Sequence, residues 1–229
     1  MTKQEIYDIL RLGGLTHAGA LGLIGNMMAE STPALKPTIA ERGRTSLSDE
    51  EYTRLADAGT WDFVHDAVGY GLCQWTYWSR KRQLLDYARS MGVSVGDGIM
   101  QVHFALAELK TNPEFAGVCK ILHSSDNIDE CADIVCRDFE RPHDLNYAAR
   151  RAYARQAEKE IVEDASAPAV PATPAGETDG SAQPEVDLAL MVLQACMQRD
   201  GFWPGAIDGI KSPEFCAALK KYAAAVASC

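Results

Sequence analysis

Apolar residues recur at helical spacing through most of the first 163 positions of the chain, and cap signals precede several of the runs. Residues 61–76 break this pattern, because they have no helical period and carry two glycines. They predict a loop or a small hairpin. We therefore expect a mainly α domain with a minor β-hairpin, its helices covering about 3–12, 17–30, 49–58, 77–91, 97–110, 113–122, 127–139 and 145–163.

Three caps sharpen the expected boundaries. Thr16 is placed to cap the helix that begins at residue 17, and Ser48 with Glu51 has the spacing of a capping box. Asn112 stands before Pro113, which suits the first position of a helix.

The composition changes abruptly at residues 164–185. This stretch is rich in Ala, Pro, Ser, Thr and Gly and has no aromatic residue, Ile or Leu. Such a composition cannot bury a core and predicts a semi-extended linker. The chain is thus divided into a domain over 1–163, a linker over 164–185 and a small helical module over 186–229.

Charge and cysteine content narrow the classes of partner. The formal net charge is −10, with 22 Lys and Arg against 32 Asp and Glu, which argues against nucleic acid as the main partner. The densest basic cluster, residues 80–82, predicts a solvated helix face or, alternatively, a patch beside an anionic ligand. The seven cysteines are odd in number and contain no C-x-x-C pair, so we expect buried thiols, no metal and no cofactor.

No apolar run approaches the length that spans a bilayer, and the N-terminus has no apolar signal region. We therefore expect no membrane insertion and synthesis in a cytoplasm without a signal peptide.

The helix expected over 17–30 ends on a carboxylate. On a helical wheel Glu30 lies at the edge of the apolar stripe, and Asn26 keeps that edge polar, with Ser31 following. Because apolar surroundings raise the pKa of a carboxylic acid, Glu30 is a candidate general acid. Asn26 and Ser31 lie beside it and are candidate substrate contacts. The alternative is a helix-end glutamate that accepts hydrogen bonds from the following loop.

Residues 69–78, GYGLCQWTYW, combine glycines, an amide and flat aromatic faces. Gly69 and Gly71 permit close backbone approach, and Gln74 offers a donor and an acceptor. Flat apolar faces are supplied by Tyr70, Trp75 and Trp78. That mixture suits sugar rings, which have apolar faces and hydroxyl edges. An aromatic hairpin packed on the core is the alternative interpretation.

Three segments occur in the same order as in a known family. GLIGNMMAES, then GYGLCQWT with SRKRQLL, then DFERPHDLNYAARRAYA resemble the phage tail lysozyme-type domain of the lysozyme-like superfamily, over roughly residues 5–160. The resemblance implies that Glu30 is the catalytic acid and that Gly71, Leu72 and Gln74 line the sugar cleft. We interpret Glu140 and Arg141 as a structural ion pair.

A second carboxylate is less clearly marked. Goose-type lysozymes carry an aspartate shortly before a comparable glycine-rich stretch, and Asp66 is close to that position, with Asp62 as the other candidate. Either could activate water, or both could cap turns. If neither activates water, the resemblance extends to lytic transglycosylases, which use one glutamate and the substrate's own hydroxyl.

The last 44 residues resemble a three-helix peptidoglycan-binding module. The resemblance rests on Leu193-Gln194 and on the turn GAIDG over 205–209, and it implies that Phe202 and Trp203 contact the wall. A helical hairpin that dimerises or closes the chain is the alternative.

Together these patterns predict a muramidase acting at the bacterial cell wall, with peptidoglycan as its partner. A lytic transglycosylase and a non-enzymatic wall-binding or virion structural protein are the alternatives. The oligomeric state, and the choice between a free endolysin and a tail component, stay open.

Overall fold

The computed structural model describes residues 1–162. The predicted linker and the C-terminal module, with Phe202 and Trp203, lie outside the described residues. No helix of residues 1–162 is long and apolar enough to cross a membrane.

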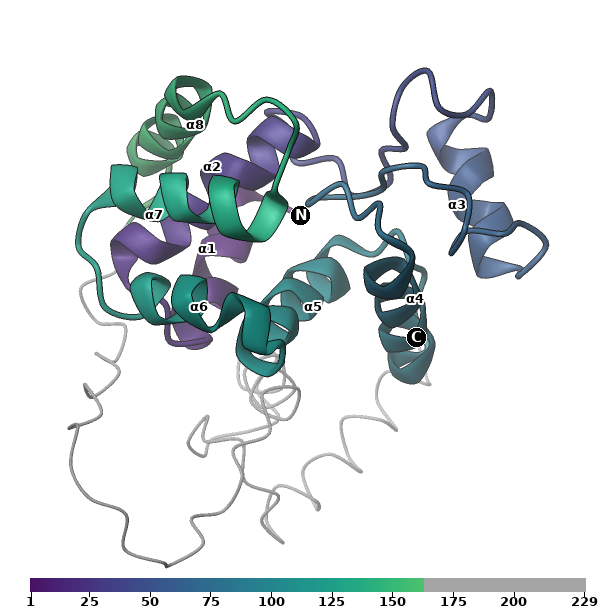
Figure 1. The fold of residues 1–229 in the computed structure, drawn as a ribbon, viewed down its shortest axis with the longest axis horizontal. Coiled ribbons are helices and arrows are strands. Elements are labelled where there is room, and N and C mark those ends of the chain that lie inside the picture. Colours follow the sequence, from purple (N-terminus) through teal and green to yellow (C-terminus); the bar gives the residue numbers. More distant parts are fainter. Residues whose placement is uncertain (163–229) are drawn as a thin grey trace, which may run out of the picture. The chain divides into compact units, whose positions relative to one another are not determined.

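The described domain is mainly α-helical, as predicted. The β features of the described residues are three isolated bridges: antiparallel ones pair Ala40 with Tyr70 and Tyr70 with Trp75, and a parallel one pairs Arg42 with Thr45. The elements follow one another along the chain as in Figure 1: α1 (Lys3–Leu12), α2 (His17–Glu30), α3 (Asp49–Asp57), α4 (Trp78–Met91), α5 (Gly98–Thr111), η1 (Pro113–Phe115), α6 (Ala116–Leu122), α7 (Ile128–Ile134), η2 (Val135–Glu140) and α8 (Tyr147–Glu160).

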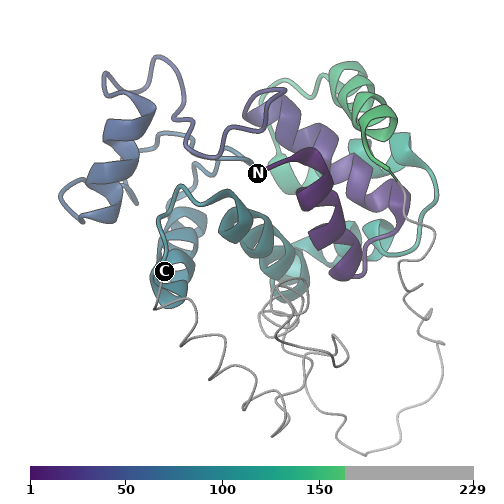
Figure 2. The ribbon, with the colours of Figure 1, turned by 180° about the vertical axis from the view of Figure 1, so that it is seen from behind.

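Helix α2 is the centre of a bundle formed with α1, α6, α7 and α8. Every residue from Ala18 to Met28 is buried. Three glycines allow the close approach of neighbouring backbones. A Cβ atom on Gly19 would lie 2.1 Å from the carbonyl oxygen of Leu122, and a Cβ on Gly25 would lie 2.7 Å from the backbone of α8. Gly22 meets α7 in the same way. The bundle is visible from both sides in Figures 1 and 2.

The other helices form a second group. α4 packs on α5, and α3 is joined to them through an aromatic cluster in which the rings of Tyr52, Phe63 and Tyr70 lie 5.3–5.8 Å apart. In both views α3 lies well away from α8. The segment 31–48 connects the bundle to this group, and the loop 61–76 joins α3 to α4 within it.

The predicted helices are present with small shifts at their ends, and the one expected over 113–122 begins as the 3-10 helix η1. Two further differences concern a cap and a helix type. Ser48 accepts from the Glu51 amide as a cap, but the Glu51 side chain pairs with Arg54 instead of completing the capping box. The helix expected over 127–139 changes at Val135 into a π-helical turn. That turn ends with Arg141 at φ 53°, a left-handed backbone conformation that residues other than glycine rarely adopt. π turns often mark functional positions.

Candidate active site

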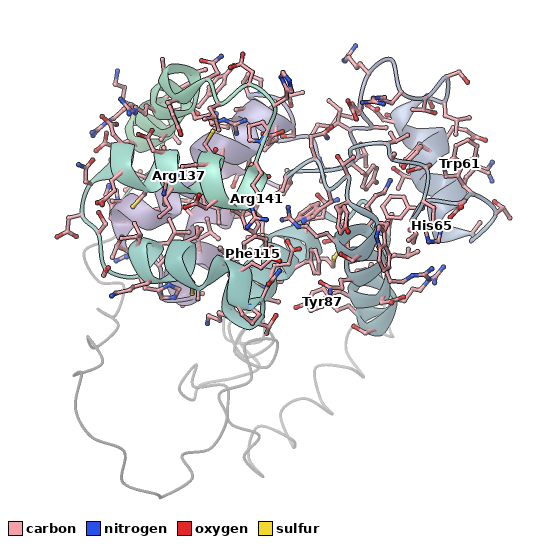
Figure 3. All side chains as sticks on the ribbon, in the orientation of Figure 1. Trp61, His65, Tyr87, Phe115, Arg137 and Arg141 are labelled. Atoms are coloured by element: carbon pink, nitrogen blue, oxygen red, sulfur yellow. The ribbon has the colours of Figure 1, made fainter. Side chains whose placement is uncertain are left out.

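A cleft of about 1120 Å³ lies in the described residues, and it is lined by both helix groups. Glu30 from α2, Glu140 from η2 and Arg141, which follows η2, line the cleft, and Gln74 lines it from the loop before α4. Three of the lining residues, His65, Phe115 and Arg141, are labelled in Figure 3 and come from separate elements. The cleft gathers polar and aromatic side chains that lie up to 113 positions apart in the sequence, from Glu30 to His143.

Glu30 lies in this cleft as the last residue of α2. Its side chain is 16% exposed, and Oε1 accepts a hydrogen bond of 2.5 Å from Nη2 of Arg150. Within the part of the chain that the structure describes, Oε2 makes no hydrogen bond. The sequence suggested apolar surroundings for this carboxylate, whereas its direct partner is an arginine from α8, 120 residues later.

Arg150 is itself held in position by α2. Nη1 donates to Oδ1 of the fully buried Asn26, at 2.8 Å, and the Asn26 amide donates to backbone oxygens of Gly22 and Ala132. Asn26 therefore does not reach the cleft; it positions the arginine that orients Glu30. Ser31 caps α2 by donating to the Met27 carbonyl and is nearly buried, so its hydroxyl also serves the helix end. Both residues were predicted as substrate contacts, and neither lines the cleft.

Glu140 is the second acidic group beside Glu30. Its Oε1 is buried and has no hydrogen-bond partner in the described residues, and the carboxyl group contacts Cys73. Burial raises the pKa of Glu140 well above its ordinary value, and the Glu30 carboxylate adds to this, against the opposing effect of Arg80 and Arg150. The surroundings of Glu140 therefore favour its neutral form more than those of an exposed glutamate do.

The predicted ion pair between Glu140 and Arg141 does not form. Arg141 instead pairs with Glu114 at 3.1 Å and donates from Nε to the Asp138 carbonyl. The left-handed backbone at Arg141 turns consecutive side chains in different directions, which explains why sequence adjacency was misleading here.

The basic cluster at 80–82 is not a solvated face. Arg80 makes two hydrogen bonds, of 2.7 and 2.8 Å, to the buried carboxylate of Glu108 and lies 4.6 Å from the Phe139 ring centre. Lys81 is completely buried, and only Arg82 is exposed. Arg80 and Lys81 therefore make buried ion pairs, with Glu108 and Asp66, beneath the surface of the cleft.

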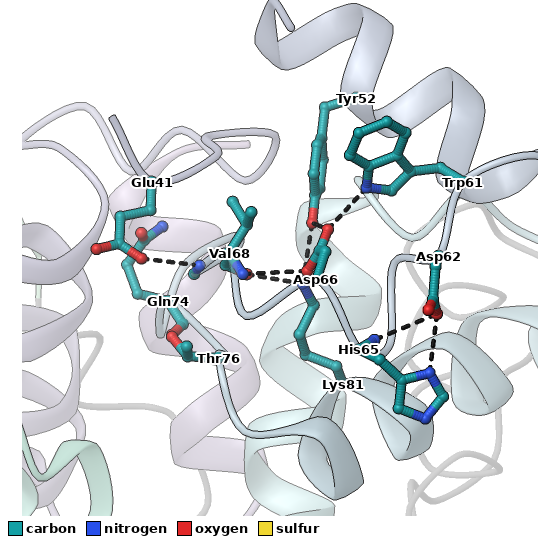
Figure 4. Close-up of polar contacts among 11 residues, drawn as sticks. Glu41, Tyr52, Trp61, Asp62, His65, Asp66, Val68, Gln74, Thr76 and Lys81 are labelled. Atoms are coloured by element: carbon teal, nitrogen blue, oxygen red, sulfur yellow. Dashed lines mark hydrogen bonds and ion pairs between the residues drawn. The ribbon is translucent and has the colours of Figure 1, made fainter. Parts of the chain in front are cut away.

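Asp66, the predicted water-activating residue, lies in a saturated cluster behind the cleft wall (Figure 4). Its oxygens accept hydrogen bonds from the side chains of Tyr52, Trp61 and Lys81, at 2.7, 2.7 and 2.5 Å, and from the amide of Val68. Burial alone would raise the pKa of Asp66, but these donors outweigh it and lower the pKa below its ordinary value. Asp62 is exposed and accepts from His65. Neither aspartate lines the cleft.

Of the five cleft residues predicted at 70, 71, 72, 74 and 75, only Gln74 lines the cleft, and Leu72 is fully buried. Tyr70 and Trp75 are fully buried; the Tyr70 hydroxyl bonds Thr53, and the Trp75 indole donates to Glu108 at 2.8 Å. Gly71 lies at φ 77°, where an added Cβ would meet the Gln101 side chain at 2.5 Å. The aromatic-hairpin alternative therefore describes Tyr70 and Trp75, which pack in the core.

The exposed aromatic side chains begin two residues after Trp75. Tyr77 and Trp78 line the cleft with 64% and 52% of their surface exposed, and the His65 ring stacks on Trp78 with centroids 6.4 Å apart. The sequence placed Trp78 in the same aromatic group as Trp75. Helix α4 begins at Trp78, and this start separates the buried aromatics from the exposed ones.

Glu41 is a cleft residue that the sequence pattern did not reveal. It lies in the segment 31–48, where no hydrophobic period points to a face, and it is brought to the cleft because residues 39–41 pair with 69–71. The glycines at 69 and 71 were the one available signal, since close backbone approach there requires a partner segment.

A comparison with known families gives one match. The model of a family described as phage tail lysozyme matches residues 1–160. No curated protein matches the chain.

Proposed function

This chain belongs to the phage tail lysozyme family, whose members cleave peptidoglycan, and we propose that it is a muramidase with Glu30 as its general acid. The scissile bond would be the glycosidic bond between N-acetylmuramic acid and N-acetylglucosamine. The observation that carries the proposal is the state of the Glu30 carboxyl group: Oε1 is fixed by Arg150, while the residue lines the cleft and Oε2 is unbonded within the described residues.

That arrangement suits proton donation to a leaving oxygen. A general acid must present one oxygen at hydrogen-bond distance from the departing atom, and fixing the other oxygen limits rotation of the carboxyl group. Because Arg150 is held by Asn26, the orientation of Glu30 depends on the bundle rather than on a surface loop.

The exposed aromatics supply a surface for the glycan. Tyr77 and Trp78 offer flat apolar faces, and Gln74 offers an amide oxygen; its Nε2 donates to the backbone at Ile39 and Gly71. Flat faces with a few fixed polar groups are typical of ligand clefts. We assign the predicted sugar stacking to Tyr77 and Trp78 instead of Tyr70 and Trp75.

Substitution Glu30→Gln tests the acid. Glutamine keeps an oxygen for Arg150 but carries no proton to donate, so release of muropeptides from purified peptidoglycan should fall by about 10²–10⁴-fold. Glu50→Gln is the matched control, because Glu50 is an exposed glutamate that pairs with Lys36 and does not line the cleft. Wild-type activity in a folded Glu30→Gln protein would refute the assignment.

A lytic transglycosylase is the second candidate, and the occupied oxygens of Asp66 favour it. Such an enzyme needs no water-activating carboxylate, because the substrate's own hydroxyl attacks. Mass spectrometry of the wild-type products separates the two: reducing ends support hydrolysis, and anhydromuramyl ends support transglycosylation.

A further inference from the structure

Hydrolysis with inversion needs a second carboxylate, on a different wall of the cleft from the acid, to take a proton from water. Four carboxylates of the described residues line the cleft, namely Glu30, Glu41, Glu114 and Glu140. If Glu30 is the acid, three remain, and their surroundings differ sharply.

Two of these three are unsuited to be the base. Glu140 has a buried Oε1 without a hydrogen-bond partner in the described residues, and burial raises its pKa well above its ordinary value, which favours the neutral form. Glu114 is 67% exposed and is paired with Arg141, so bulk water surrounds its carboxylate and nothing orients it toward a bound substrate.

Glu41 has the features that the others lack. Its side chain is 38% exposed, and its only ion-pair partner in the described residues is Arg44, which is 64% exposed and 3.4 Å away. Gly69 holds both the backbone and the side chain of Glu41. The Glu41 amide donates to the Gly69 carbonyl at 2.8 Å, and Oε2 accepts from the Gly69 amide at 3.1 Å. The carboxylate is thus oriented through Oε2, while Oε1 accepts one long hydrogen bond, of 3.4 Å, from Nε of the exposed Arg44.

Two more oxygens converge on the same point (Figure 4). A Cβ atom built on Gly69 would lie 2.9 Å from Oε1 of Gln74, 3.1 Å from Oγ1 of Thr76 and 3.3 Å from Oε2 of Glu41. The absence of a side chain at residue 69 lets these groups approach one another. Neighbouring acceptors of this kind can hold a water molecule by both of its hydrogens.

We propose that Glu41 is the catalytic base that activates water in the hydrolysis proposed above, on which this inference rests. Glu30 gives its proton to the glycosidic oxygen as the bond from that oxygen to C1 breaks, and the bonding electrons leave with the oxygen. The water oxygen forms the new bond to C1, and its proton passes to the Glu41 carboxylate. Glu41 then releases this proton to solvent, and Glu30 takes one up.

Substitution Glu41→Gln is the first test. Glutamine retains an acceptor for the Gly69 amide, so the melting temperature should stay close to that of the wild type, whereas muropeptide release should fall by about 10²–10⁴-fold. Wild type, Glu30→Gln and the control Glu50→Gln are assayed in parallel on the same peptidoglycan. Wild-type activity in Glu41→Gln would overturn the inference.

Chemical rescue separates a base from a residue that only supports the loop. Azide attacks without losing a proton, so Glu41→Ala should regain product formation in azide and yield a glycosyl azide of inverted configuration. A Glu41→Ala protein that is folded, inactive and not rescued would indicate a supporting role and overturn the inference.

The outcomes distinguish this inference from the proposed function. If the wild type releases no muropeptides, or Glu30→Gln is fully active, the proposed function fails. If both behave as expected but the wild-type products carry anhydro ends or retain the anomeric configuration, the role of Glu41 fails, because no base-activated water then attacks the substrate with inversion.

Discussion

Asp66 and Glu30 are both partly buried carboxylates bound to a cation, yet their surroundings differ. Asp66 accepts from four donors, including a lysine that is completely buried, and does not line the cleft. Glu30 accepts from Arg150 on one oxygen and faces the cleft with the other. The number of fixed donors, rather than burial or charge, separates an acid that holds the fold from one that is available for chemistry.

The largest expected effect is a loss of stability at Asp66, whose oxygens accept hydrogen bonds from four donors. Lys81→Met removes the buried cation and leaves Asp66 without its charge partner, so the free energy of unfolding should fall by about 3–5 kcal/mol. Urea denaturation followed by circular dichroism measures it. Adding Asp66→Asn to the variant should recover part of the loss, because the uncompensated charge is then gone. A loss below about 1 kcal/mol would place this pair with ordinary surface ion pairs.

The corresponding change beside Glu30 should cost less stability and more activity. Arg150→Met removes hydrogen bonds to Glu30 and Asn26, which should lower the free energy of unfolding by about 1–3 kcal/mol, since water in the cleft can still solvate Glu30. Muropeptide release should fall because the carboxyl group loses its fixed orientation.

Arg151→Met is the matched control for this variant. Arg151 is the next residue along α8, is 44% exposed and pairs with Asp133. Its substitution should cost about 0–1 kcal/mol and leave muropeptide release unchanged. Equal effects of the two substitutions would contradict a special role for Arg150.

The smallest expected effect is a change in pH dependence at Glu140. Because the folded-state pKa of this residue is raised, the stability that it contributes is complete below the unfolded value of 4.5 and is lost as pH rises through the folded value. Glu140→Gln cannot ionise, so its stability relative to the wild type should increase as the pH rises above 4.5. Unfolding curves at several pH values up to about pH 8 measure this difference. A difference independent of pH would show that Glu140 ionises normally.

The helices were predictable because their signals are local. The caps at Thr16 and Asn112 and the apolar period of α2 lie within a few residues of the structure that they specify. Glu30 was predictable in the same way, as the carboxylate at the end of a buried helix. The Val135–Glu140 π turn was not predictable from this pattern, because it interrupts an unbroken helical period.

The surroundings of the site depend on long-range pairing. Arg150 reaches Glu30 across 120 residues, and Glu41 reaches Gly69 across 28, so neither contact leaves a periodic trace in the sequence. The aromatic residues show the same limit. Their composition predicted a set of flat faces, but the exposed pair, Tyr77 and Trp78, is distinguished from the buried Trp75 only by where α4 begins.

The glycines of α2 have a consequence for how the enzyme tolerates change. At Gly19, Gly22 and Gly25 the helix meets its neighbours largely backbone to backbone, so its position is set by main-chain contact rather than by side-chain shape. Conservative replacement of core leucines should therefore alter stability while barely displacing Glu30. Replacing one of these glycines by alanine would improve helix propensity yet push α2 outward. The position of Glu30 should thus depend little on the side chains of the core and strongly on these three glycines.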